Sequence, residues 1–299
     1  GSIGGAIACN LAGPRRIQVG AARDHFLGFC AVSGRGEVFK SGGTVVKNVT
    51  GFDLSKLLAG SFGTLAVMSR VTFKVMPAPE KIRTILCFGV KDNQAIKILA
   101  AALGSSNEVS GAAYLPALAA SRSNVNYISG AGTGVAAIRI EGPKSSVEHR
   151  SKALINQIDK FGQTDELHTQ NSNLLWKEIS DVGVLLGDGQ VWRLSVPPMN
   201  GAKIVKNILS SIKANVFYDW GGGLIWLETN NSNISAGIIR EAIKLGGGHA
   251  TLIRAEASVR EKVSVFEPQS DVLSNLTARI KKGFDPKSIL NPGRLYKGV

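Results

Sequence analysis

The feature that most constrains the fold is an order of predicted elements that occurs twice between residues 82 and 254. Apolar runs of strand length and apolar positions at helical spacing give the order β-α-β-β-α in each copy. The first copy has its strands and helices, in order, at residues 82–90, 92–103, 109–115, 134–140 and 145–161. The second copy has them at residues 191–196, 200–212, 215–220, 224–228 and 233–245, with a closing strand at 250–254. This repeat predicts two ferredoxin-like units that share an antiparallel sheet with helices on one face.

The residues before this repeat predict a separate domain. Apolar and polar side chains alternate at 64–76, as in a half-buried strand, and a hairpin is expected around Gly34-Arg35-Gly36. Asp53 can cap a short helix that ends before Gly60. Pro77-Ala78-Pro79 suits neither a helix interior nor a central strand, so it marks the expected boundary.

We therefore expect an α+β protein in three parts. Residues 1–79 would form the first domain, residues 80–283 would form a second domain built on the repeat, and residues 284–299 would be an arm that returns to the first. An amphipathic helix is predicted at 271–282, and another at 173–182 between the two copies of the repeat.

Composition excludes several classes of protein. No apolar stretch reaches the length that spans a bilayer, and no leader-like segment opens the chain, so a cytoplasmic protein is expected. Cys9, Cys30 and Cys87 stand far apart, which suggests neither a disulfide framework nor a zinc or iron-sulfur site. Any redox chemistry must then come from a bound cofactor.

The chain carries 35 Lys and Arg against 22 Asp and Glu, a formal charge of +13. This excess would favour a phosphate-bearing ligand, nucleic acid, an anionic membrane face or an acidic protein partner, and charge alone does not choose among them. Arg15-Arg16 and Lys281-Lys282 are the only adjacent basic pairs. Because no aromatic residues alternate with the scattered basic ones, nucleic acid is disfavoured.

The opening segment Gly1-Ser2-Ile3-Gly4-Gly5 has a bare backbone that can approach a flat ring or a phosphate. By itself it fits a plain tight turn equally well. It is followed in order by Asn10, Gly13, Arg23-Asp24, Gly42-Gly43, the segment 47–54 and the turn 60–65. The segment 47–54 reads K-N-V-T-G-F-D-L, the turn reads G-S-F-G-T-L, and the chain closes with N-P-G-R at 291–294.

This ordered set resembles the vanillyl-alcohol oxidase and p-cresol methylhydroxylase family of FAD-linked oxidases. Within that family it is similar to the FAD-binding subunits of bacterial glycolate oxidase. The resemblance is dense up to Pro79 and sparse from there to the C-terminal arm. It implies the second half of a PCMH-type FAD-binding domain, followed by a cap domain.

The resemblance also implies a set of cofactor-binding residues. Ser2, Ile3, Gly4, Gly5 and Asn10 would meet the ribityl or ring region of FAD, while Gly13 and Asp24 would shape the adjoining loop. Gly60, Ser61, Gly63, Thr64 and Val67 would lie toward the adenosine half, and Asn291 of the closing motif joins the set. The alternative is that the glycines only form turns and that Asp24 only caps a helix or forms a salt bridge.

Two departures from the family pattern stand out. Phe62 occupies the position that is Glu in the G-S-E-G-T turn of many relatives. The first subdomain of the family, with its own pyrophosphate loop, has no counterpart in these 299 residues. We therefore expect an N-terminally truncated chain that holds only part of the FAD site and binds FAD poorly alone.

The catalytic residues are unknown from sequence. His25, His149, His168 and His249 show no H-x-H or H-x-x-x-H spacing, so no metal site is predicted. Asp219-Trp220-Gly221-Gly222-Gly223 is read as a turn with Trp220 in the core.

His249 and Arg254 could act as a base and a carboxylate clamp. We favour a surface position for His249 and an ion pair with Glu228 or Glu256 for Arg254.

Two functional hypotheses follow. The first is an FAD-dependent subunit that oxidises a 2-hydroxy acid, glycolate to glyoxylate, beside a sister flavoprotein subunit and an iron-sulfur subunit that takes the electrons. It would work in the cytoplasm or, through its partners, at the inner face of the membrane, with the cap domain's sheet and positive charge serving to dock them. The rival is a non-catalytic assembly subunit that keeps the fold and binds FAD weakly or not at all.

Overall fold

The computed structural model describes residues 1–46, 51–185, 187–230 and 234–299. The chain divides into two compact units. Unit 1 comprises Gly1–Gly13, Gly20–Pro77 and Pro268–Val299, and unit 2 comprises Pro14–Val19 and Ala78–Glu267. This division differs from the predicted ranges in two places. The C-terminal helix, which we had assigned to the second domain, belongs to unit 1, and the short segment at 14–19 belongs to unit 2.

Unit 1 is built on a three-stranded antiparallel sheet of order β2-β1-β3. Its strands are β1 (Phe26–Ser33), β2 (Val38–Gly42) and β3 (Ala66–Phe73). Its helices are α1 (Ile3–Ala8), α3 (Ala22–His25), α4 (Leu54–Leu58) and α13 (Asp271–Phe284). The hairpin predicted around residues 34–36 is confirmed, because β1 pairs with β2 from Gly28↔Gly42 to Val32↔Val38.

Local chemistry explains the elements of unit 1. The side chain of Asp53 accepts a hydrogen bond from the Lys56 backbone N–H at 3.3 Å, which begins α4 as predicted. Gly60 has φ +84°, the left-handed conformation that glycine adopts without steric cost. Phe26 and Phe29 of β1 pack with Ile7 and Leu58 into a small core, so both helices lie against the sheet.

Unit 2 contains an eight-stranded antiparallel sheet of order β11-β8-β10-β9-β5-β6-β4-β7. The first repeat contributes β4 (Lys81–Phe88), β5 (Gly111–Leu115), β6 (Val135–Gly142) and β7 (Thr164–Leu167). The second contributes β8 (Gln190–Ser195), β9 (Ala214–Asp219), β10 (Leu224–Thr229) and β11 (His249–Arg254). Each repeat orders its strands fourth, first, third, second, as ferredoxin-like units do, and the repeats join where Tyr114 of β5 pairs with Tyr218 of β9.

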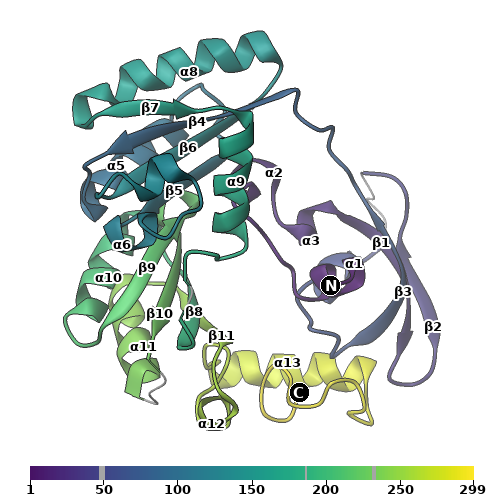
Figure 1. The fold of residues 1–299 in the computed structure, drawn as a ribbon. Coiled ribbons are helices and arrows are strands. Elements are labelled where there is room, and N and C mark those ends of the chain that lie inside the picture. The colour runs from purple at the N-terminus through teal and green to yellow at the C-terminus, as the bar shows by residue number, and fades with distance from the viewer. Residues whose placement is uncertain (47–50, 186, 231–233) are drawn as a thin grey trace. The chain divides into compact units, whose positions relative to one another are not determined.

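Four long helices cover one face of this sheet (Figure 1). They are α5 (Asp92–Leu103), α8 (Lys144–Ile158), α10 (Gly201–Leu209) and α11 (Ile234–Gly246). Ile96, Val147, Ile204 and Ile239 represent their buried sides, which share one apolar core with alternate residues of the strands. The helix predicted to begin at residue 233 begins at Ile234 in the part of the chain that the structure describes.

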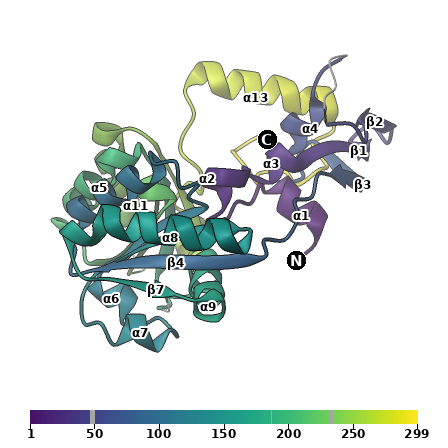
Figure 2. The ribbon, with the colours of Figure 1, turned by 90° about the horizontal axis from the view of Figure 1, so that it is seen from above.

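The prediction of helices on one face only is wrong. Three further helices, α6 (Ala117–Ala120), α7 (Asn126–Ser129) and α9 (Thr169–Ser180), lie on the opposite face, as Figure 2 shows beside β4 and β7. They bury Ala119, Ile128 and Trp176 in a second core. The sequence missed α6 and α7 because single turns are too short to leave a helical period. It did predict a helix at 173–182, which overlaps α9, but a local pattern does not say which face of the sheet a helix covers.

The remaining elements of unit 2 are short. They are α2 (Arg16–Val19), α12 (Ala257–Arg260) and the 3₁₀ turns η1 (Asp159–Phe161), η2 (Pro198–Asn200) and η3 (Trp220–Gly222). Across the described residues, no helix combines the length and the apolar character needed to cross a membrane.

Candidate functional site

The first helix of unit 1 leaves its backbone accessible. Ser2 caps α1, since its Oγ accepts a hydrogen bond from the Gly5 N–H at 3.1 Å, and Ser2, Ile3 and Gly5 are exposed. A Cβ added at Gly4 would meet no atom within 4 Å, whereas one at Gly5 would lie 3.3 Å from Ser2 Oγ. A flat group can therefore approach the backbone most closely at Gly4.

The turn at residues 60–64 is tied to α1 by its backbone. The Gly60 N–H donates to Ile7 O at 3.2 Å, and the Phe62 N–H donates to Ala8 O at 2.9 Å. Ser61 and Thr64 are buried, and Thr64 Oγ1 donates to Ser61 O at 2.8 Å. These two hydroxyl-bearing residues thus shape the turn that lies against α1.

Asn10 and Asp24 hold the loop between α1 and α3. Asn10 Oδ1 accepts from the Arg23 N–H at 2.9 Å, and Asp24 Oδ2 accepts from the Ala21 N–H at 2.7 Å. Gly20 has φ +88°, and a Cβ there would lie 2.8 Å from Asp24 Cβ, so only glycine fits.

Two more residues of the predicted set lie on the surface. Gly13 is exposed, and so is Val67 on β3, opposite Val32 of β1.

The C-terminal arm reaches the same turn. Asn291 Nδ2 donates to Phe62 O at 3.0 Å, and Gly63 lies close enough that a Cβ would come within 2.7 Å of that nitrogen. Buried Lys281 donates to Thr64 O and to Leu290 O, both at 2.8 Å, and forms an ion pair with Asp285 at 2.7 Å.

Sequence reasoning missed Lys281. Its only signal was the spacing of four residues to Asp285, which places both side chains on one face of a helix. Burial alone would raise the pKa of Asp285, but the hydrogen bonds from Lys281 and from the Leu290 and Ile289 N–H groups lower it. The arm is therefore anchored by a charged group that stays ionised.

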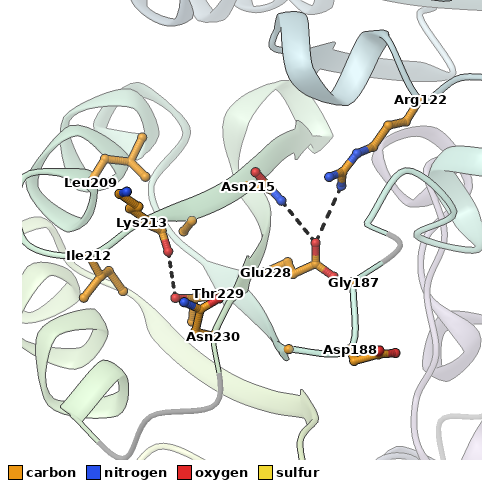
Figure 3. Close-up of a pocket in the computed structure, with 12 residues that line it drawn as sticks. Arg122, Gly187, Asp188, Leu209, Ile212, Lys213, Asn215, Glu228, Thr229 and Asn230 are labelled. Carbon is orange, nitrogen blue, oxygen red and sulfur yellow. Dashed lines mark hydrogen bonds and ion pairs between the residues drawn. The ribbon is translucent and has the colours of Figure 1, made fainter.

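Unit 2 has a cavity of about 510 Å³ at one end of β9 and β10 (Figure 3). The buried carboxylate of Glu228 faces it and accepts from Asn215 Nδ2 at 3.2 Å, and Arg122 and Arg254 lie 3.6 and 3.2 Å away. The ion pair expected for Arg254 is confirmed. Because Glu228 is already paired on three sides, the charge in this cavity is largely compensated.

The turn after β9 departs from its prediction. Trp220 is not in the core but half-exposed, with φ +51°, while the preceding Asp219 is buried. Burial raises the pKa of Asp219 to about 7, against the lowering effects of a hydrogen bond from the Trp220 N–H and of the Arg139 charge.

His249 is exposed at the first position of β11, as expected. Partial burial lowers its pKa, and so does the charge of Arg193. Among the described residues, no three His, Cys, Asp or Glu side chains lie close enough to share a metal ion.

The chain was compared with families, curated proteins and solved structures. No family model matches it. The glycolate oxidase subunit GlcE of Escherichia coli K12 is 30% identical over 296 residues, which cover 98% of this chain and 71% of that protein. The glycolate oxidase subunit GlcD of Bacillus subtilis is 27% identical over 334 residues, covering 99% and 68%.

A D-lactate dehydrogenase of Anaerostipes hadrus is 36% identical over 85 residues, or 28% of this chain. Among solved structures, an alkyldihydroxyacetonephosphate synthase superposes with a TM-score of 0.65 at 17% identity, covering 98% of this chain and 58% of the synthase. The chain thus spans a little over half the length of that synthase, and this similarity concerns the fold alone.

Proposed function

The chain belongs to the family of FAD-linked oxidoreductases that includes the glycolate oxidase subunits, and from this premise we propose that it is the FAD-binding subunit of a complex that oxidises glycolate to glyoxylate. FAD would be held by the backbone of α1 and by the turn at residues 60–64. An iron-sulfur subunit and a sister flavoprotein subunit would complete the complex.

The open backbone at Gly4 is the observation that carries this proposal. Gly4 lies in a helix whose last residues bond to the turn at 60–64, so the bare backbone and the glycine-rich turn are parts of one hydrogen-bonded substructure. Bound FAD would supply the acceptor for the two electrons of a C–H oxidation. The protein's own contribution is to place donor N–H groups beside the cofactor and to hold them rigidly.

The supporting residues fit a rigid cradle. Asn10, Asp24 and Asn291 all direct their side chains at backbone groups of unit 1. We propose that their role toward FAD is to fix the loops around it. Such fixed loops lower the entropy lost when a cofactor binds, because they are already ordered.

The same observation favours a second candidate. Since these polar side chains are satisfied within unit 1, the cradle would keep its shape without any cofactor. Phe62, with φ +53°, also occupies the centre of the turn. A non-catalytic subunit that retains the fold and helps to assemble the complex is therefore the alternative.

The test compares Gly4→Val with Gly283→Val. Gly283 lies in helix α13 of the same unit, and a Cβ there also meets nothing within 4 Å, so it controls for a branched side chain in a helix. Gly4→Val should weaken FAD binding by about 1–3 kcal/mol, the cost of overpacking, while Gly283→Val should leave it unchanged. Flavin content and the thermal midpoint are measured together on purified protein.

The outcomes separate the candidates. A Gly4→Val protein that loses stability but keeps its FAD affinity would remove Gly4 from the cofactor site. Weak or absent flavin binding by a parent protein that still co-purifies with its partner subunits would favour the assembly role. Dye reduction that follows the flavin content of the variants would support the oxidoreductase.

A further inference from the structure

The second repeat of unit 2 has a partly open sheet face. Trp192 and Leu194 of β8 lie in the core beneath the four long helices, so Arg193 between them points to the opposite face. On that face Arg193, Ser195 and Trp226 remain half-buried, and His249 is exposed. These side chains are accessible from one side of the sheet.

A rigid aromatic ring stands at the edge of this face. Trp220 opens the short turn between β9 and β10, followed by Gly221 at φ +65° and Gly222 at φ +99°. A Cβ at Gly221 would lie 2.5 Å from Leu103 Cδ1, and one at Gly222 would lie 2.5 Å from Ile96 Cδ1. Because α5 presses on the turn so closely, only glycines fit there, and the position of Trp220 is fixed.

Two guanidinium groups lie against this ring. The central carbon of Arg16 is 4.6 Å from the Trp220 ring centroid, and that of Arg193 is 5.1 Å away. Cation–π contacts of this kind hold an arginine by the face of its guanidinium group. The N–H groups at the edge of the plane stay available to an acceptor.

Arg16 is held in place by its neighbours in sequence. Arg15 Nε donates to Glu141 Oε1 at 2.8 Å, and Ile17 packs against the main core of unit 2. The two residues of the basic pair therefore have different partners, because Arg15 forms an ion pair with Glu141 while Arg16 lies on the Trp220 ring.

The first repeat contains a similar pair that is fully satisfied. Arg139 lies 4.8 Å from the Trp176 ring centroid and donates to Ser110 Oγ and Ser110 O, both at 3.1 Å. Its Nε is also 3.9 Å from Glu141 Oε2. Within the described part of the chain, Arg16 and Arg193 have no such acceptor or ion-pair partner.

The surroundings of the two arginines are positively charged. Burial lowers the pKa of Arg193, and the charge of Arg16 lowers it further, as expected for two cations that share one ring. Burial is the largest cause of the lowered pKa of His249. The charges of Arg193 and Arg16 lower this pKa further, while the charge of Glu267 raises it. A neutral imidazole here can donate or accept a hydrogen bond.

We propose that Arg16 and Arg193, fixed on Trp220, bind the carboxylate of a small organic acid, with His249 beside it for a neighbouring hydroxyl group. A guanidinium group offers planar, paired N–H donors that match the bidentate geometry of a carboxylate. The choice of a 2-hydroxy acid as the ligand rests on the proposed function, whereas the choice of an anion rests on the arginines alone.

The experiment titrates purified protein with glycolate by calorimetry, with glycolamide and inorganic phosphate as separate probes. Arg16→Gln and Arg193→Gln are compared with Arg260→Gln, which removes the same charge from an exposed helix of unit 2. Each of the first two changes should weaken glycolate binding by about tenfold, the value of one charge-assisted hydrogen bond. Arg260→Gln should bind as the parent does, and glycolamide, which lacks the charge, should bind far more weakly than glycolate.

Three results would overturn the proposal. One is that the folded protein shows no saturable glycolate binding, another is that both single variants Arg16→Gln and Arg193→Gln bind glycolate as the parent does, and the third is that phosphate binds more tightly than glycolate. Arg16 is exposed, so its variant is expected to fold. The assay needs no flavin, so loss of FAD binding with glycolate binding retained would refute the proposed function alone. Flavin-linked oxidation with an unchanged KM for glycolate in Arg193→Gln would refute this site alone.

Discussion

The first repeat of unit 2 carries helices on both faces of its strands, whereas the second leaves part of one face open. The cause lies in one connection. Between β5 and β6 the chain runs through residues 116–134 and forms α6 and α7, while between β9 and β10 it has only residues 220–223. Helix α9 then packs on β4 and β7 of the first repeat.

Each repeat contains an arginine that lies on a tryptophan ring, and the two arginines differ in burial and in their polar partners. In the first repeat, Arg139 on Trp176 is buried and satisfied, and burial lowers its pKa to about 10. In the second repeat, Arg193 on Trp220 is half-buried, and its pKa is lowered by burial and by the neighbouring Arg16 charge. Where helices cover the sheet face, an arginine–tryptophan pair contributes to packing. Where the face is open, a pair of the same kind leaves guanidinium N–H groups that can bind an anion.

The largest expected effect comes from removing the tryptophan of each repeat. Trp176 is buried, and its indole N–H donates to Thr84 Oγ1 at 2.7 Å. Trp176→Ala should lower the free energy of unfolding by about 4–5 kcal/mol, because it leaves a large cavity. Trp220→Ala should lower it by less than about 1 kcal/mol, since the half-exposed ring leaves no closed cavity. Urea unfolding of both variants measures the difference.

Equal losses of stability in the two alanine variants would contradict the comparison. Such a result would mean that Trp220 is as much a core residue as Trp176. The glycolate titration described above adds a second measurement, because Trp220→Ala should also weaken binding while Phe at this position should partly restore it.

The sequence predicted the regular elements of unit 2 well where local signals were strong. Helix α5 matches its predicted bounds at both ends, because Asp92 lies at its start and Gly104 directly follows it. Strand β7 was missed because Thr-Asp-Glu-Leu at 164–167 has no apolar alternation. It forms because the exposed edge of β4 offers backbone partners, a long-range cause that a local pattern does not contain.

The candidate site residues also fall into those with a local sequence signal and those that depend on long-range contacts. The opening glycines could be proposed from the sequence alone because the chemistry expected of them belongs to the backbone and is local. Lys281 binds Thr64 O, and Arg16 meets Arg193 at Trp220, only after the fold brings distant segments together. No spacing in the sequence predicts these contacts, although the pair Arg15-Arg16 was visible as one of two adjacent basic pairs.

The next effect concerns the ends of equivalent strands. Strand β5 ends in buried Leu115, whereas β9 ends in buried Asp219. Because the pKa of Asp219 in the folded protein is about 7 and its ordinary value is 3.8, the folded state binds the proton more tightly. The stability that Asp219 contributes is therefore fully present below about pH 4, is lost as pH rises toward 7, and stays absent above it, by roughly 4 kcal/mol in total.

Asp219→Asn removes this titration while the amide oxygen can still accept from the Trp220 N–H. The variant should be more stable than the parent at pH 8 and should differ little from it near pH 4. Thermal or urea unfolding across this range measures the effect, and parallel pH profiles for the two proteins would show that Asp219 does not titrate as inferred.

The smallest expected effect compares the two arginines themselves. Arg139→Met removes a buried cation that bonds Ser110 twice, although Glu141 keeps its ion pair with Arg15 at 2.6 Å. It should lower the free energy of unfolding by about 2 kcal/mol. This is less than the cost of breaking a buried ion pair and leaving one of its charges without a partner. Arg193→Met should change it by less than about 0.5 kcal/mol, because no acceptor in the described structure loses a donor. Methionine can pack on either ring, so the matched substitution isolates the polar contacts. A larger loss for Arg193→Met than for Arg139→Met would reverse the assignment, making the second repeat's arginine structural and the first repeat's dispensable.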